Sequence, residues 1–176
     1  MFVYVVRHAS AGESRSDPKK DEKRPLDKEG IEQCRQLGRV LAALRVEIAL
    51  VISSPLKRAT QTAALLCNEI GYEGKLVLDD SLRPEAGFNE FRTMLQQHRK
   101  LDAVMVVGHN PSISQFASRL VSDGQNESSV DFKKGGAAKL ELKSRGAQLL
   151  WCVAPKLIRA AYESSIASSR PKSSRK

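Results

Sequence analysis

The chain has 176 residues, of which 41% are hydrophobic and 28% charged, and this length and composition suit a single globular domain. The longest uninterrupted apolar stretches contain six residues, whereas a membrane-spanning helix needs about 20, so we expect no membrane-spanning segment. The formal net charge is +9, and the excess lies in residues 133–176, which contain 11 basic and 2 acidic residues. In the tail from residue 163 onward this charge is interpreted as solubilising, and the alternative is an electrostatic contact with an acidic partner, a membrane surface or nucleic acid. Aromatic residues make up only 5% of the chain, so we do not expect nucleic acid to be a partner.

The first residues, the cysteines and the last residues each give a further expectation. Residues 1–6 are apolar and run directly into Arg7 without a basic leader, which is typical of a buried strand rather than a secretory signal. The cysteines are odd in number and far apart, which predicts reduced thiols and a cytoplasmic location. Residues 161–176 are basic and rich in serine, so we expect a disordered or loosely ordered tail behind one domain of residues 1–160.

Apolar periodicity predicts strands and helices that alternate along the chain. Strands are expected at residues 2–6, 48–52, 75–78 and 103–107, followed by a hairpin of residues 137–142 and 148–153. Amphipathic helices are expected at residues 31–44, 56–70, 88–95 and 113–120, and a loop at residues 9–24. This alternation predicts an α/β protein, a three-layer sandwich whose largely parallel central sheet is flanked by helices.

Polar side chains follow three of the expected parallel strands. Arg7 and His8 follow the first strand, and His109 follows the fourth. Ser54 follows the second, with Arg58 in the first turn of the next helix. Because the carboxyl ends of parallel strands meet at one edge of a sheet, we expect these side chains to converge.

The chemistry of this group favours an anion over a metal ion. Arginine offers a planar fork to phosphate oxygens, and the helix N-termini nearby add backbone donors. Two guanidinium groups would repel a divalent cation, and the sequence contains no acidic cluster or His-x-His pattern at these positions. We therefore predict a phosphate site that needs no metal and no cofactor. The third histidine, His98, lies at an expected helix end and is interpreted as structural.

Three motifs at these strand ends resemble those of a known family. They are Arg7-His8-Ala9, residues 54–62 (Ser-Pro-Leu-Lys-Arg-Ala-Thr-Gln-Thr) and Gly108-His109-Asn110-Pro111. Together they resemble the signatures of the histidine phosphatase superfamily, whose fold is called phosphoglycerate mutase-like. The short chain and Arg24-Pro25-Leu26 before the first expected helix are most similar to the SixA-type phosphohistidine phosphatases. The resemblance covers residues 1 to about 155.

The resemblance implies a role for each residue of the group. His8 would be the nucleophile and become transiently phosphorylated, while Arg7, Arg58 and His109 complete the phosphate pocket. A nucleophilic histidine must be neutral at the attacking nitrogen, so we expect its other nitrogen to donate to a backbone carbonyl. Guanidinium groups around it would spread their charge over the phosphoryl oxygens in the transition state.

Two residues near the pocket keep alternative interpretations. Ser54 either ends its strand and caps the next helix, or contacts the phosphate. Arg24 either lines the mouth of the pocket, as the Arg-Pro-Leu resemblance implies, or lies in solvent.

The leaving group decides which substrate this site suits. An alkyl phosphate leaves as an alkoxide and needs a proton donor, for which Glu85 is the candidate, with Glu90 second. The alternative is that Glu85 is a surface glutamate beside Arg83. Phosphohistidine has a far less basic leaving group, the imidazole, and the short loops predict an open site.

We therefore expect a phosphatase acting on phosphohistidine in a phosphotransfer signalling protein. Two alternatives remain: a small-molecule phosphomonoesterase that uses Glu85, and a non-catalytic binding module that uses the basic C-terminal quarter. The oligomeric state stays open.

Overall fold

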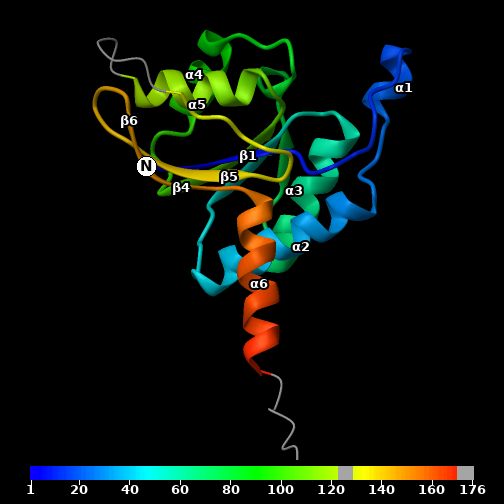
Figure 1. Cartoon of the computed structure of the whole chain (residues 1–176). Coiled ribbons are helices and arrows are strands. Elements are labelled where there is room, and N and C mark those ends of the chain that lie inside the picture. The colour runs from blue at the N-terminus through cyan, green and yellow to red at the C-terminus, as the bar shows by residue number, and fades with distance from the viewer. Residues whose placement is uncertain (123–128, 170–176) are drawn as a thin grey trace, which may run out of the picture.

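A six-stranded sheet forms the centre of the protein, which we describe from a computed structural model (Figure 1). The structure describes residues 1–122 and 129–169, and of residues 165–169 the backbone only. The strands are β1 (Phe2–Arg7), β2 (Leu50–Ser53), β3 (Leu76–Leu78), β4 (Ala103–Gly108), β5 (Ala137–Leu142) and β6 (Ala147–Val153). Their spatial order is β3-β2-β4-β1-β5-β6.

The sheet is parallel over its first four strands and antiparallel over the last two. β1 pairs with β4 and β2 pairs with β4 and β3 in parallel, whereas β5 runs antiparallel to β1 and forms a hairpin with β6. Arg7 therefore lies opposite Gly108, and Ser53 lies opposite Val107. This register brings the carboxyl ends of β1, β2 and β4 to one edge, as the sequence predicts.

Helices cover both faces of the sheet (Figure 1). α4 (Phe88–Gln97) and α5 (Ser112–Val121) lie on one face, and α2 (Lys28–Ala43), α3 (Lys57–Ile70) and α6 (Pro155–Ser169) lie on the other. Successive residues of a strand point to opposite faces, so Val3 and Val5 join the core under α4 and α5. Tyr4 and Val6 join the core under α2 and α3. The predicted three-layer α/β sandwich is confirmed.

The structure departs from the sequence expectation in two segments. Residues 9–24 contain a short helix, α1 (Pro18–Glu22), because Asp17 accepts hydrogen bonds from the backbone N–H groups of Lys19 and Lys20. The chain is helical to Ser169, beyond the expected domain boundary at residue 160, and Ile158 of α6 is buried in the core beside α2. Residues 170–176 of the expected tail, and residues 123–128 of the loop after α5, lie outside the described part of the chain.

Two further findings concern the expectations about membrane-spanning helices and about the cysteines. No helix within residues 1–122 and 129–169 combines the length and apolar character that a membrane crossing requires. Cys34, Cys67 and Cys152 are free thiols.

Candidate active site

The backbone pairing of β1 and β4 brings two histidines together. The backbone N–H of His8 donates to the carbonyl of Gly108 at 2.9 Å, which extends the pairing one residue beyond the strand ends. The ring centroids of His8 and His109 are 4.8 Å apart, and their planes are inclined by 53°. Both rings are buried, with 7% and 2% of each residue exposed. The predicted convergence of these two residues is therefore present.

The hydrogen bond of His8 fixes its tautomer. Nδ1 lies 2.8 Å from the carbonyl oxygen of Ala9, and a carbonyl can only accept, so Nδ1 carries the hydrogen. Burial, the hydrogen bond to the Ala9 carbonyl, which acts in the opposite direction, and the guanidinium groups of Arg58 and Arg7 together lower the pKa of His8 to about 3. At neutral pH the ring is thus uncharged, with the lone pair on Nε2. The predicted backbone acceptor is confirmed.

His109 is held by a serine from the neighbouring strand end. Its Nε2 lies 2.8 Å from the hydroxyl oxygen of Ser54. Burial, together with the neighbouring His8 and Arg58, lowers the pKa of His109 to about 2. The alternative that Ser54 caps α3 needs correction, because Leu56 holds the N-cap position and no side chain caps the helix, although the Ser54 hydroxyl accepts a hydrogen bond of 3.4 Å from the Leu56 backbone N–H. The same hydroxyl contacts His109, because the strand pairing places the ends of β2 and β4 side by side.

Arg7 makes one hydrogen bond to the protein and Arg58 makes two, both to Asp21, the shorter of them to its backbone carbonyl at 2.9 Å. Arg7 Nη1 donates to the carbonyl of Phe132 at 2.6 Å, and Arg58 Nη1 donates to the carboxylate of Asp21 at 3.1 Å. In the described part of the chain, four buried side-chain polar atoms have no hydrogen-bond partner. Three of the four are Arg7 Nε, Arg58 Nε and His109 Nδ1. All three atoms belong to residues that line one pocket, so the unpaired polar groups of the described chain are concentrated at this site.

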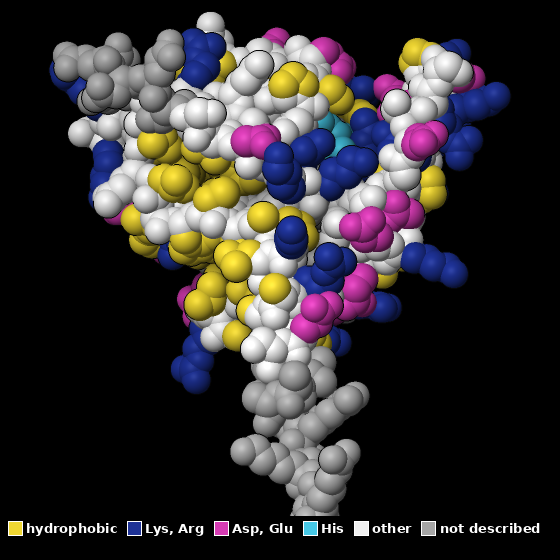
Figure 2. Space-filling view, in the orientation of Figure 1, with side chains coloured by type: hydrophobic (Ala, Val, Ile, Leu, Met, Phe, Trp, Pro, Cys, Tyr) yellow, Lys and Arg dark blue, Asp and Glu magenta, His cyan; other side chains and the backbone are white. Residues whose placement is uncertain are grey.

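These residues line one pocket of about 840 Å³. Its lining includes Arg7, His8, Asp21, Arg24, Arg58, Pro84, His109 and Lys134. Figure 2 shows histidine side chains in a recess with Lys and Arg side chains around it. Such a recess can hold a phosphoryl group between a neutral imidazole and fixed positive charges.

Arg24 is one wall of this pocket rather than a solvated side chain. Only 8% of the residue is exposed, and its Nη1 donates to the carbonyl of Ala11 at 2.7 Å. Its Nε donates to the carboxylate of Asp21 at 2.8 Å. The structure thus favours the pocket alternative for Arg24.

Asp21 is the pocket residue that the sequence analysis missed. Its carboxylate bridges Arg24 and Arg58, with N–O distances of 2.8 and 3.1 Å. Partial burial raises the pKa of Asp21, but hydrogen bonds from the Arg15 backbone and from Arg24, together with the charge of Arg58, lower it to about 2. The sequence held one signal for this residue, the Asp17–Pro18 helix start, which would have placed Asp21 and its neighbours on α1.

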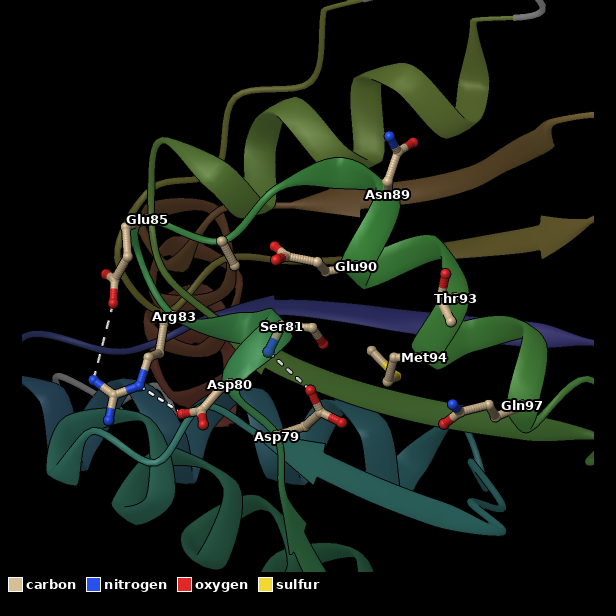
Figure 3. A pocket seen from close by; sticks show the side chains of 11 residues that line it. Asp79, Asp80, Ser81, Arg83, Glu85, Asn89, Glu90, Thr93, Met94 and Gln97 are labelled. Atoms are coloured by element: carbon tan, nitrogen blue, oxygen red, sulfur yellow. Dashed lines mark hydrogen bonds and ion pairs between the residues drawn. The ribbon is translucent and has the colours of Figure 1, made fainter.

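Glu85 does not line the pocket that contains His8. It lines a neighbouring pocket of about 810 Å³, and its carboxylate lies 4.0 Å from Arg83 Nη1, with 71% of the side chain exposed (Figure 3). Pro84 lines the His8 pocket instead. Glu90 also lines the neighbouring pocket and accepts a hydrogen bond from the Gly87 backbone at the start of α4. The interpretation of Glu85 as a surface glutamate beside Arg83 therefore fits the structure.

The loop after His8 is supported by the start of α2. The Asp27 carboxylate accepts hydrogen bonds from the Ser10 hydroxyl and the Gly12 backbone, each at 2.8 Å. Gly30 lies so close to this loop that a Cβ atom there would come within 2.0 Å of the Ser10 carbonyl oxygen. On the other side, Gly135 has a φ of +75° and donates its backbone N–H to the His8 carbonyl at 3.0 Å. The position of His8 thus depends on two glycines that lie far from it in sequence.

No group of three or more His, Cys, Asp or Glu side chains arranged for a metal ion occurs within the described residues.

Comparison with known proteins identifies the family. Residues 3–100 match the model of the histidine phosphatase superfamily (branch 1), and the chain belongs to this superfamily. An uncharacterised protein of Picosynechococcus sp. is 30% identical over 139 residues, which cover 77% of this chain and 82% of that protein. Membership of the superfamily supports a phosphatase activity for the chain.

Solved structures show the same fold. The protein histidine phosphatase SixA in complex with tungstate matches with a TM-score of 0.79 at 23% identity, covering 90% of this chain and 99% of that one. The alpha-ribazole phosphatase of Shigella flexneri matches with a TM-score of 0.71 at 17% identity, covering 88% and 97%. The fold of the chain is therefore that of SixA structures, and it is shared with a small-molecule phosphatase.

Proposed function

We propose that the protein removes the phosphoryl group from phosphohistidine in a protein, through a covalent intermediate on His8. The observation that carries this proposal is the neutral His8, whose Nδ1 donates to the Ala9 carbonyl while His109 and two arginines surround the same pocket. A lone pair on Nε2 is what an attack on phosphorus requires.

The reaction has two steps. In the first, His8 Nε2 forms a bond to phosphorus while the P–N bond of the substrate breaks, and a neutral imidazole leaves with the electron pair because its other ring nitrogen carries a proton taken from solvent. In the second, water attacks the phosphorus of phospho-His8, the P–Nε2 bond breaks with its electron pair returning to His8, the proton of the water passes to solvent, and inorganic phosphate leaves. Arg7 and Arg58 spread positive charge over the three phosphoryl oxygens in both transition states.

The carboxylates near the pocket favour an imidazole leaving group over an alkoxide. Glu85 lines the neighbouring pocket beside Arg83 and is not among the residues that line the pocket of His8. Asp21 lines the His8 pocket, but a pKa of about 2 keeps it ionised at neutral pH, so it cannot donate a proton. An imidazole needs much weaker acid assistance than an alkoxide, and an ionised carboxylate stabilises its protonated form.

The same argument separates this proposal from the small-molecule phosphomonoesterase. That alternative needs Glu85 as the acid, whereas the Glu85 side chain is 71% exposed beside Arg83 and does not line the pocket of His8. The binding-module alternative would not require the buried, unpaired polar atoms of Arg7, Arg58 and His109. We also propose that residues 1–160 hold the whole catalytic domain and that the substrate is a phosphotransfer protein of the cytoplasm.

A substrate panel tests the proposal. We expect hydrolysis of a phosphohistidine peptide and of imidazole phosphate to exceed that of para-nitrophenyl phosphate and of sugar phosphates in kcat/KM. Glu85→Gln should leave phosphohistidine turnover unchanged, and His8→Asn should abolish it, with His98→Asn as the matched histidine control. Preferred hydrolysis of a sugar phosphate, lost in Glu85→Gln, would instead establish the phosphomonoesterase.

A further inference from the structure

A second groove, of about 570 Å³, continues from the catalytic pocket. Arg7 and Lys134 line both spaces, so the groove and the catalytic pocket adjoin at these two side chains. The groove runs between α2, the loop that carries Lys133 and Lys134, and the first turns of α6. A small phosphate ester held at His8 would fill only the catalytic pocket, whereas a substrate protein would extend into this groove.

One wall of the groove is basic. It is formed by Lys133, Lys134, Lys156 and Arg159, all exposed. Lys133 pairs with Asp131 at 2.7 Å, but within the described residues no carboxylate forms an ion pair with Lys156 or Arg159. Lys156 and Arg159 are three residues apart on α6, so they project from the same side of the helix.

The opposite wall, on α2, is acidic and already hydrogen-bonded. Glu29 and Glu32 each accept a hydrogen bond at 3.0 Å from a glutamine one turn further along the helix, Gln33 and Gln36. The groove therefore has one basic and one acidic wall. The basic wall lies next to Arg7, which also lines the catalytic pocket. Figure 2 shows Lys and Arg side chains below the histidine recess, toward α6, beside a row of Asp and Glu side chains.

The groove accounts for part of the uneven charge of the sequence. The whole excess of +9 lies in residues 133–176, and four of the 11 basic residues there form this one wall. A solubilising role would not require them to lie along one groove that opens into the phosphate pocket.

We propose that the basic wall of Lys133, Lys134, Lys156 and Arg159 docks an acidic stretch of the substrate protein beside its phosphohistidine. The proposal rests on the proposed function, because the phosphohistidine must enter the pocket of His8. Exposed charges of this kind act mainly on the rate of encounter and on the choice of partner, and their effect falls as salt screens them.

Two synthetic phosphohistidine peptides test this docking surface. They are identical except that one carries glutamates beside the phosphohistidine and the other carries glutamines. At an ionic strength of about 0.01 M we expect the wild-type enzyme to prefer the glutamate peptide by about tenfold in kcat/KM, and the preference to shrink at about 0.15 M. The double variant Lys156→Glu/Arg159→Glu should lose the preference while hydrolysing imidazole phosphate at the wild-type rate.

A second double variant, with the same change in net charge at another place, serves as the matched control. Lys75 and Lys100 are exposed and lie just before β3 and β4, at the amino ends of these parallel strands and therefore opposite the catalytic edge. Lys75→Glu/Lys100→Glu should keep the preference for the glutamate peptide. Equal rates for the two peptides in wild type, or an unchanged preference in Lys156→Glu/Arg159→Glu, would overturn the docking proposal alone. Failure to hydrolyse either peptide or imidazole phosphate would overturn the proposed function as well.

Discussion

The two buried histidines make the stability of the protein depend on pH in a window where few other side chains titrate. In the folded protein the pKa of His8 is about 3 and that of His109 is about 2, whereas a histidine in an unfolded chain has a pKa of about 6.5. Between these values the unfolded chain binds more protons than the folded one, so the free energy of unfolding must fall as the pH falls. The stabilisation is fully present above pH 6.5 and is lost progressively toward pH 3.

The magnitude follows from the two pKa differences. Between pH 7 and pH 5, each histidine in the unfolded chain becomes protonated while its folded counterpart stays neutral, which removes about 2 kcal/mol. Both together remove about 4 kcal/mol, a large part of the 5–15 kcal/mol that stabilises a typical domain. The carboxylates Asp21 and Asp27, whose pKa values are lowered, titrate below this window.

Urea unfolding at pH 7 and pH 5 measures this effect. We expect wild type to lose about 4 kcal/mol between the two pH values, and the double variant His8→Asn/His109→Asn to lose much less, because asparagine does not titrate. If wild type and the double variant lose the same amount, the two imidazoles are not held neutral by burial and the reasoning fails.

Three further predictions concern residues around the pocket. Ser54→Ala removes the hydrogen-bond partner of the buried His109, so we expect kcat for phosphohistidine peptide to fall by about 10- to 100-fold and the stability in urea unfolding to fall by about 1–3 kcal/mol, whereas Ser54→Thr, which keeps the hydroxyl, should retain more activity than Ser54→Ala. Asp21→Asn removes a negative charge from between two pocket cations, so calorimetry should find tungstate bound on the order of tenfold more tightly; unchanged or weaker binding would show that Asp21 does not compete with the oxyanion. Gly30→Ala places a methyl group against the Ser10 carbonyl, which should destabilise the protein by about 1–3 kcal/mol in urea unfolding and lower kcat; wild-type stability would mean that the loop after His8 moves freely.

The sequence predicts the fold and the meeting of the two histidines because both follow from local patterns. Residues 2–6 and 103–107 are continuous apolar runs typical of buried parallel strands, and parallel strands bring their carboxyl ends together whatever the details of the loops. Placing His8 and His109 at those ends therefore needs no knowledge of tertiary contacts.

The remaining features of the site depend on contacts between distant segments. Asp21 matters because α1 places its carboxylate between Arg24 and Arg58, and residue 58 lies 37 positions away. Ser54 contacts His109 rather than capping a helix because α3 begins only at Lys57. Glu85 follows a residue that lines the pocket, yet its carboxylate lies beside Arg83. A sequence pattern can place such residues near a site but cannot decide which partner each side chain finds.

The phosphoenzyme tests the central claim most directly. Rapid quenching of the reaction with phosphohistidine peptide, followed by peptide mapping and phosphorus NMR at alkaline pH, should find phosphate on Nε2 of His8, because Nδ1 is occupied by the hydrogen bond to Ala9. Phosphate on Nδ1 of His8, phosphate on His109, or turnover at the full rate in His8→Asn would contradict the account.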